Sequence, residues 1–187
     1  KMKRKIKSIL LLSLTVAAIT VFFAFSASAK EYSSGDFKYN VGSKNAVLLS
    51  YTGKDKEVKI PSKVKGVPIT SIADWAFDEV KTMETISIPS TVTKIGEAAF
   101  NSCSSLRRVN LPKNLKKISA SAFWYCINLK QVFIYDKVTS IGKNAFTGCN
   151  NATVYVVKGS YAETHVKKLD NVKMGYRYMT SLKLTKN

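Results

Sequence analysis

The chain has 187 residues, of which 45% are hydrophobic. This is enough apolar material for a packed core, so the composition excludes a wholly disordered protein. Its formal net charge of +18 indicates anionic partners such as acidic polysaccharide, teichoic acid, sulfated glycan or nucleic acid. The alternative is that the charge only keeps the surface solvated. The excess is uneven, because residues 30–97 carry 10 basic and 9 acidic side chains, whereas residues 98–187 carry 15 and 3.

A secretory signal peptide is predicted for residues 1–29. Five basic side chains lie within the first seven residues, an apolar run extends from Ile9 to Phe25, and Ala27-Ser28-Ala29 is a small-x-small cleavage sequence. This layout keeps the positive end in the cytosol while the apolar run enters the export channel. We expect cleavage after Ala29, so that the protein meets a membrane only through this segment; the alternative is an uncleaved anchor.

Residues 30–57 are predicted to form an N-terminal cap. The apolar residues of this segment alternate with polar ones, which favours a β-hairpin with one buried face. They are Phe37, Tyr39, Val47, Leu49 and Tyr51. Such a hairpin covers the first of the repeats that follow, because the end of a stacked array exposes an apolar face.

A 23-residue period runs through residues 58–158 and gives about four to five units. The residues that recur at this interval are Ile72, Ile95, Ile118 and Ile141; Phe77, Phe100, Phe123 and Phe146; Cys103, Cys126 and Cys149, with Val80 in the first unit; and Ile88, Leu111, Ile134 and Val157. A unit of this size cannot bury its own apolar side, but stacked coils cover one another. The period therefore predicts a solenoid with recurring side chains stacked along its interior.

Each unit is predicted to contain one strand and one tight turn. The segment Leu106–Pro112 alternates apolar and polar residues, which predicts a short strand that pairs in parallel with its counterpart in the next coil. The apolar residues Ala99, Phe100, Cys103 and Leu106 have three- and four-residue spacing, which favours a short helical or 3-10 turn. The expected fold class is thus an α/β repeat solenoid, with a short parallel β-sheet on one face and helical turns on the other.

Residues 159–187 are predicted to form a C-terminal cap and tail. Ser160 followed by Glu163, with Lys167 and Lys168 in the last turn, predicts a short capping helix over Ser160–Leu169. The tail Thr180–Asn187 shows strand-like alternation.

The pattern Leu106-x-x-Val109-x-Leu111, followed by Leu115 and Ile118, resembles the leucine-rich repeat. The unit Ile88–Pro112 is similar to those of the BspA-like subfamily of bacterial surface proteins. The resemblance implies a right-handed coil, a secreted or cell-surface location, and adhesion with extracellular-matrix proteins as typical partners.

No enzymatic constellation is found in the sequence. His165 is the only histidine and has no nucleophile motif near it, and no pair of acids has a spacing suited to glycoside cleavage. The three cysteines share a position with Val80, so we expect buried thiols, the alternatives being one disulfide or a metal site. We therefore expect no enzyme, no cofactor and no metal.

The outward side chains of the predicted strands provide the candidate ligand-binding surface. Glu57, Thr85, Arg108 and Gln131 are expected in one row, and Lys59, Ser87, Asn110 and Phe133 in the next. The candidate binding residues are Arg107, Arg108, Asn110, Lys130, Gln131, Phe133 and Tyr135. Guanidinium groups beside aromatic rings suit sulfated sugars or protein partners. For Trp124 and Tyr125 we expect packing on the convex side, the alternative being an exposed anchor.

The predicted function is a secreted or cell-surface binding or adhesion module. It would recognise a host or bacterial surface protein, or an anionic glycan or wall polymer, through the solenoid surface, with no specific nucleic acid as ligand. The alternative is a structural repeat domain that presents other parts of a larger surface protein and has no ligand of its own.

Overall fold

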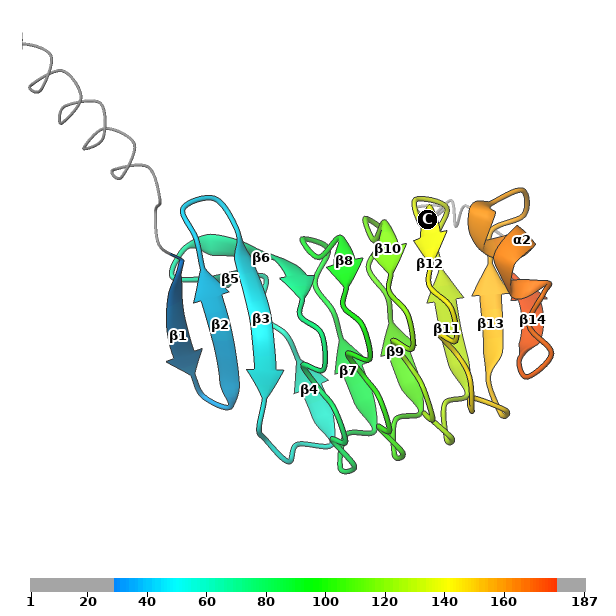
Figure 1. Cartoon of the computed structure of the whole chain (residues 1–187), viewed down its shortest axis with the longest axis horizontal. Helices are drawn as coiled ribbons and strands as arrows, with labels where there is room; N and C mark the ends of the chain where they lie inside the picture. Colours follow the sequence, from blue (N-terminus) through cyan, green and yellow to red (C-terminus); the bar gives the residue numbers. More distant parts are fainter. Residues whose placement is uncertain (1–28, 178–187) are drawn as a thin grey trace, which may run out of the picture.

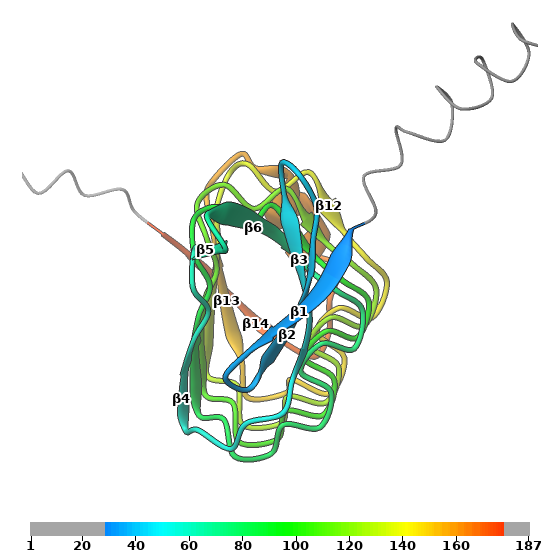
Figure 2. The ribbon, with the colours of Figure 1, turned by 90° about the vertical axis from the view of Figure 1, so that its left-hand side faces the viewer.

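Each repeat contributes two short strands to a β-solenoid whose coils stack along one axis (Figure 1, Figure 2). The computed structural model describes residues 29–177, so the predicted signal peptide, apart from Ala29, and the tail Thr180–Asn187 lie outside the described residues. Within the described part of the chain, no helix has both the length and the apolar character needed to cross a membrane. The predicted stacking of coils is confirmed.

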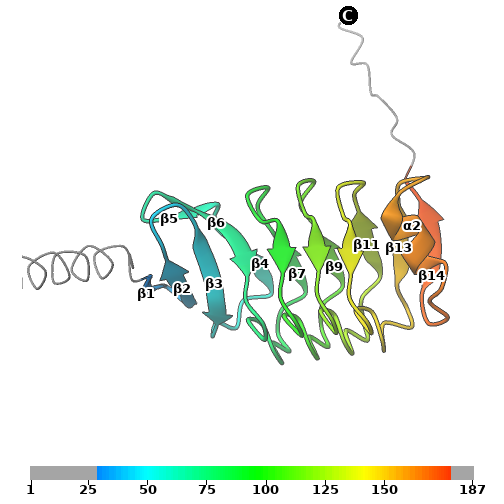
Figure 3. The same ribbon diagram turned by 45° about the horizontal axis from the view of Figure 1, so that its top comes forward.

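The first sheet has six parallel strands and is the one that the sequence predicts (Figure 3). In spatial order, its strands are β4 (Glu57–Lys59), β7 (Thr85–Ser87), β9 (Arg108–Asn110), β11 (Gln131–Ile134), β13 (Thr153–Val156) and β14 (Lys173–Tyr176). Thr85 pairs with Arg108, and Arg108 with Gln131, so the 23-residue period sets the register. The period breaks afterwards, because Ile134 pairs with Val156 and not with the predicted Val157.

A second sheet of eight strands was not predicted. Its repeat strands are β6 (Val67–Ile72), β8 (Lys94–Ile95), β10 (Lys117–Ile118) and β12 (Ser140–Ile141), and β5 (Lys63–Val64) pairs with β6. The recurring isoleucines pair from coil to coil within it. Strands of two residues are too short to show an alternation in the sequence, which explains why only their isoleucines are visible in it.

The predicted helical or 3-10 turns beside the phenylalanines reduce to isolated turns: the backbone N–H groups of Asn101 and Leu106 donate to carbonyls three residues back at 3.0 Å, but no continuous helix forms. Alternate backbone N–H groups, those of Ala98, Phe100 and Ser102, donate to carbonyls of the next coil at 2.8–3.0 Å and so make no helical bonds. Ala98 and Ser102 also have positive φ angles of 48° and 52°, which a right-handed helix does not allow. The only helix within residues 29–177 is α2 (Tyr161–Val166), so the α part of the predicted fold class reduces to one short element.

The phenylalanines form the predicted internal ladder. Phe77, Phe100, Phe123 and Phe146 are at most 1% exposed. Successive ring centroids lie 4.9, 5.1 and 5.6 Å apart, and the planes differ by only 15°, 2° and 3°. Tyr51 extends the stack towards the N-terminus at 5.4 Å from Phe77. Parallel stacking at this distance is favourable in a buried setting, so the ladder holds successive coils in register.

The cysteines are buried thiols, as predicted, and no disulfide joins them. Each Sγ lies 3.0–3.1 Å from the carbonyl oxygen of a phenylalanine in the preceding coil, and so satisfies a buried acceptor. At the last coil the amide of Asn171 takes this role and donates to the carbonyl oxygen of Phe146 at 2.7 Å. Burial raises the pKa of the Cys103 thiol to about 12, so this thiol is a poor nucleophile.

Antiparallel strands β1 (Lys30–Ser34), β2 (Phe37–Val41) and β3 (Ala46–Tyr51) cover the N-terminal end of the solenoid (Figure 1). The hairpin of β2 and β3 is the predicted one. Its buried face was partly assigned wrongly, because Ala46 and Leu48 are fully buried, whereas Val47 and Leu49 are half-buried. Both faces of β3 are apolar, so alternation alone does not identify the inner one.

The C-terminal end is formed by α2 together with β14, and not by a helix alone. Ser160 caps α2 as predicted, since its hydroxyl accepts the backbone N–H of Glu163 at 3.2 Å. The carboxylate of Glu163 accepts the backbone N–H of Gly159 at 2.6 Å and the hydroxyl of Tyr176 in β14 at 2.7 Å, and it pairs with Lys167 at 2.8 Å. Glu163 therefore links the helix to the last strand.

Acid is expected to release this link. The ion pair with Lys167, with the hydrogen bonds from Tyr176 and Gly159, lowers the pKa of Glu163 from 4.5 to about 2. Because the pKa of Glu163 is lower in the folded state than in the unfolded state, the charged carboxylate stabilises the fold. This contribution is complete above pH 4.5 and is lost as the pH falls from about 4.5 towards 2. We expect Glu163→Gln to lower the melting temperature at pH 7 and to lessen its fall over that range. Glu57→Gln, at an exposed position of β4, is the control, and equal acid sensitivity of the wild type and Glu163→Gln would contradict the assignment.

Candidate functional site

The outward side of the six-stranded sheet, here called the sheet face, is the surface that the repeat exposes most regularly. Along the first five strands the inward residue is buried, as for Val109 and Val132 at 0% exposure, while its neighbours point to solvent. The first outward row is Glu57, Thr85, Arg108, Gln131, Thr153 and Lys173. The second contains Lys59, Ser87 and Asn110, followed on the later strands by Phe133, Tyr155 and Gly175. The sequence predicts these rows through β11.

A cationic hollow lies over β7, β9 and β11. It is lined by Glu84, Thr85, Arg107, Arg108, Lys130 and Gln131. The one acid of this set, Glu84, already pairs with Lys56 at 3.3 Å. Among the residues that the structure describes, no acidic side chain pairs with Arg107, Arg108 or Lys130. Three neighbouring cations without a protein counter-ion make this hollow attractive to anions.

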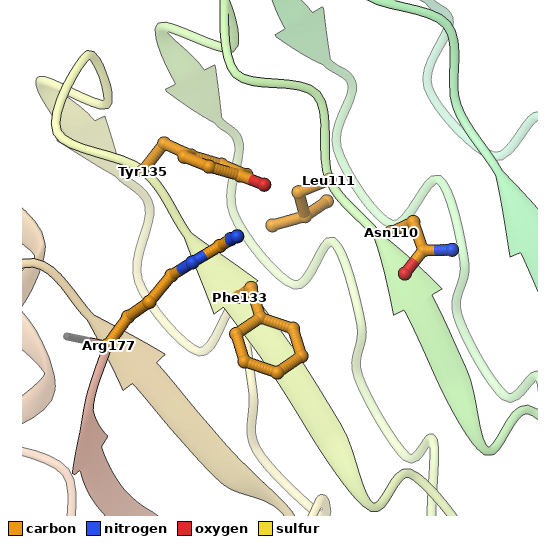
Figure 4. A pocket seen from close by; sticks show the side chains of 5 residues that line it. All are labelled: Asn110, Leu111, Phe133, Tyr135 and Arg177. Carbon is orange, nitrogen blue, oxygen red and sulfur yellow. The ribbon is translucent and has the colours of Figure 1, made fainter. Parts of the chain in front are cut away.

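An aromatic pocket lies next to the hollow, towards the carboxyl ends of β9 and β11. Figure 4 shows this pocket. It has a volume of ≈ 320 Å³ and is lined by Asn110, Leu111, Phe133, Tyr135 and Arg177. The guanidinium carbon of Arg177 lies 4.8 Å from the ring centroid of Tyr135 and 5.5 Å from that of Phe133. Phe133 also stacks on Tyr155 with centroids 4.8 Å apart. The pocket thus joins a cation to aromatic walls.

The seven residues that the sequence predicts as a binding surface fall into these two adjoining places. Asn110, Phe133 and Tyr135 line the aromatic pocket, and the other four line the cationic hollow: Arg107, Arg108, Lys130 and Gln131.

Sequence reasoning missed Arg177 and Tyr155. Arg177 follows β14, which continues the sheet only 20 residues after its partners in β13, so a search at 23 residues does not find it. Tyr155 was detectable in principle, because Val154 and Val156 flank it in the alternation of a strand.

Exposed aromatic side chains lie on the turn side of the solenoid, here the side formed by the turns that follow the second sheet, such as residues 120–125 and 143–148. Trp124 is 38% exposed and Tyr125 is 50% exposed, so the expected packing of both on the convex side is wrong. Their rings meet edge-on, with centroids 5.0 Å apart.

Within residues 29–177 no group of three His, Cys, Asp or Glu side chains is placed to hold a metal ion.

The family assignment follows from comparison with known proteins. Residues 51–153 match the BspA type leucine-rich repeat region in six copies, and the chain belongs to this family. It is therefore a leucine-rich repeat domain related to bacterial leucine-rich repeat proteins. No curated protein matches the chain.

Solved bacterial structures share the fold. A leucine-rich repeat protein from Bacteroides capillosus is 27% identical with a TM-score of 0.61, over 78% of this chain and 98% of that one. The T. pallidum leucine-rich repeat protein is 28% identical with a TM-score of 0.57, over 67% and 71%. A leucine-rich repeat protein from Bacteroides ovatus is 28% identical with a TM-score of 0.59, over 69% of this chain and 38% of that one.

Proposed function

We propose that the domain is an extracytoplasmic binding module, not an enzyme, which holds an anionic polymer against the sheet face. The observation that carries the proposal is the group of Arg107, Arg108 and Lys130, three adjacent exposed cations that have no acidic partner among the described residues. A protein keeps like charges together at some electrostatic cost, and an anionic ligand removes that cost.

The wider charge distribution supports the same partner. The excess of 15 basic over 3 acidic residues falls in residues 98–187, which supply β9, β11, β13 and β14 of the sheet. A polymer with repeated negative charges can meet several of these cations at once, whereas a small anion meets one or two. Multiple weak contacts of this kind add up to useful affinity.

An extracytoplasmic location is part of the proposal. The layout of residues 1–29 favours export, and BspA-type repeats resemble those of bacterial surface proteins. Acidic polysaccharides and wall polymers are abundant outside the cell, where such a surface would meet them. The family resemblance also suggests adhesion, which binding to a surface polymer would provide.

Charge reversal in the hollow tests the proposal. We expect Arg108→Glu with Lys130→Glu to weaken binding to immobilised heparin by about tenfold or more, because two attractive contacts of up to about 1 kcal/mol each become repulsive. Both side chains are exposed, so the melting temperature should stay within about 2 °C of the wild type.

The matched control reverses two exposed cations outside the six-stranded sheet, one directly before β10 and one shortly after β12. Lys116→Glu with Lys143→Glu changes the net charge equally and leaves the sheet face untouched. Equal losses in the two double variants would assign binding to overall charge and not to the sheet face. Absence of binding by the unmutated domain to heparin and to teichoic acid would leave the alternative of a presenting domain without a ligand.

A further inference from the structure

We propose that the aromatic pocket is a subsite for one sugar unit of an acidic polysaccharide, with Arg177 as the receptor for its carboxylate or sulfate group. This inference rests on the proposed function and goes further, because it names the class of polymer and the residue that recognises its charged group. Arg177 lies outside the cationic hollow and comes from a different part of the chain, directly after β14.

The position of Arg177 is fixed at both ends of the residue. Its backbone N–H donates to the carbonyl oxygen of Val156 at 3.0 Å and so continues the pairing of β14 with β13. Its guanidinium group lies over the rings of Tyr135 and Phe133, at 4.8 and 5.5 Å from their centroids. A side chain held in this way loses little conformational entropy when a ligand binds.

The donors of Arg177 remain available to a ligand. None of the ion pairs in the described part of the chain includes it. Figure 4 shows the guanidinium end directed into the pocket, with the Tyr135 ring on one side and the Phe133 ring on the other. A planar guanidinium with free N–H groups along its edge binds a carboxylate or sulfate in a bidentate manner, which a lysine ammonium does not reproduce.

The walls of the pocket suit a sugar ring. Phe133 and Tyr135 give the pocket two aromatic walls, and Tyr155 supports Phe133 by stacking on it with centroids 4.8 Å apart. An apolar ring face packs against the C–H groups of a sugar, while the exposed amide of Asn110 and the hydroxyl of Tyr135 can bond its hydroxyl groups. The volume of ≈ 320 Å³ is sufficient for one such ring.

The pocket and the hollow can act on the same chain of sugars. Arg108 and Asn110 lie two residues apart on β9, so their side chains leave the same face of the sheet about 7 Å apart. Gln131 and Phe133 repeat this relation on β11. A polysaccharide with repeated acidic groups can therefore place one in the pocket and another in the hollow, which favours it over a compact anion.

Calorimetric titration with defined oligosaccharides tests the proposal. The probes are a heparin hexasaccharide for sulfate and a hexamer of galacturonic acid for carboxylate, with neutral maltohexaose as the blank. We expect Arg177→Ala to weaken binding of at least one acidic probe by about tenfold and Arg177→Lys by about threefold. Lys143→Ala, which removes an exposed cation from the turn side, should change it by less than about twofold.

The outcomes separate this subsite from the proposed function. Suppose that Arg177→Ala lowers the affinity for the acidic probes as little as Lys143→Ala does, while the Arg108→Glu, Lys130→Glu variant no longer binds these probes. The subsite is then wrong and the proposed function stands. If the unmutated domain binds neither acidic probe, the subsite is wrong, and the proposed function is wrong as well when immobilised heparin and teichoic acid also retain nothing. Binding to a protein alone also contradicts the subsite. Should Arg177→Ala fail to fold, Asn110→Ala on the opposite wall replaces it. We then expect Asn110→Ala to weaken binding of an acidic probe, and an affinity equal to that of Lys143→Ala would contradict the subsite.

Discussion

Phe123→Ala is expected to lower the free energy of unfolding by about 3–5 kcal/mol, the largest effect of any substitution considered. The side chain is fully buried and stacks on Phe100 and Phe146 at 5.1 and 5.6 Å, so its removal leaves a cavity with aromatic walls above and below. Each coil also fixes its neighbours, so the loss cannot be confined to one unit. Denaturant unfolding followed by circular dichroism measures the change.

Phe133→Ala is the matched control. It removes the same atoms from a half-exposed position of the sheet face, where the contacts with Tyr155 and Arg177 contribute about 1 kcal/mol. A loss for Phe123→Ala no larger than for Phe133→Ala would contradict the phenylalanine ladder as the element that holds the coils together.

Gly142→Ala is expected to cost about 3 kcal/mol in the free energy of unfolding. A methyl group on Gly142 would lie 2.6 Å from the Cα of Ala120 in the preceding coil and closer still to the backbone nitrogen of that residue. These are backbone atoms, which cannot rotate away as a flexible side chain does, so the two coils must move apart. Alanine also makes the unfolded chain less flexible than glycine does, but this offsets less than about 1 kcal/mol of the loss in the free energy of unfolding.

Ser119→Ala is the control for this substitution. It lies one period before Gly142 and already carries a Cβ, so we expect a change within about 0.5 kcal/mol. A Gly142→Ala protein as stable as the Ser119→Ala protein would show that the coils are not as closely stacked as described.

The regular part of the fold was predictable because it depends on one repeated physical constraint. Every coil must bury the same face against the next, so Phe100 and Ile118 recur at 23 residues and reveal both the period and the inward side. The same alternation places Arg108 and Asn110 on the outward side, so the sequence predicts most of the candidate surface.

The parts that were missed depend on backbone geometry or on breaks in the period. The spacing of Ala99, Phe100 and Cys103 is that of a helix, but the left-handed residues Ala98 and Ser102 turn the chain and direct alternate backbone N–H groups to the next coil. β14 lies 20 residues after its partners in β13, so nothing in the repeat identified Arg177. Only pairing in three dimensions brings Arg177 to Phe133 and Tyr135.

The central claim is that the cations of the sheet face hold an anionic polymer. The salt dependence of heparin binding tests this claim most directly. The affinity of the unmutated domain and of the Arg108→Glu, Lys130→Glu variant is measured between low and physiological ionic strength. Binding through several cations displaces counter-ions, so the logarithm of the affinity should fall steeply with that of the salt concentration, and less steeply in the variant. An affinity independent of salt, or equal slopes for the two proteins, would contradict the claim.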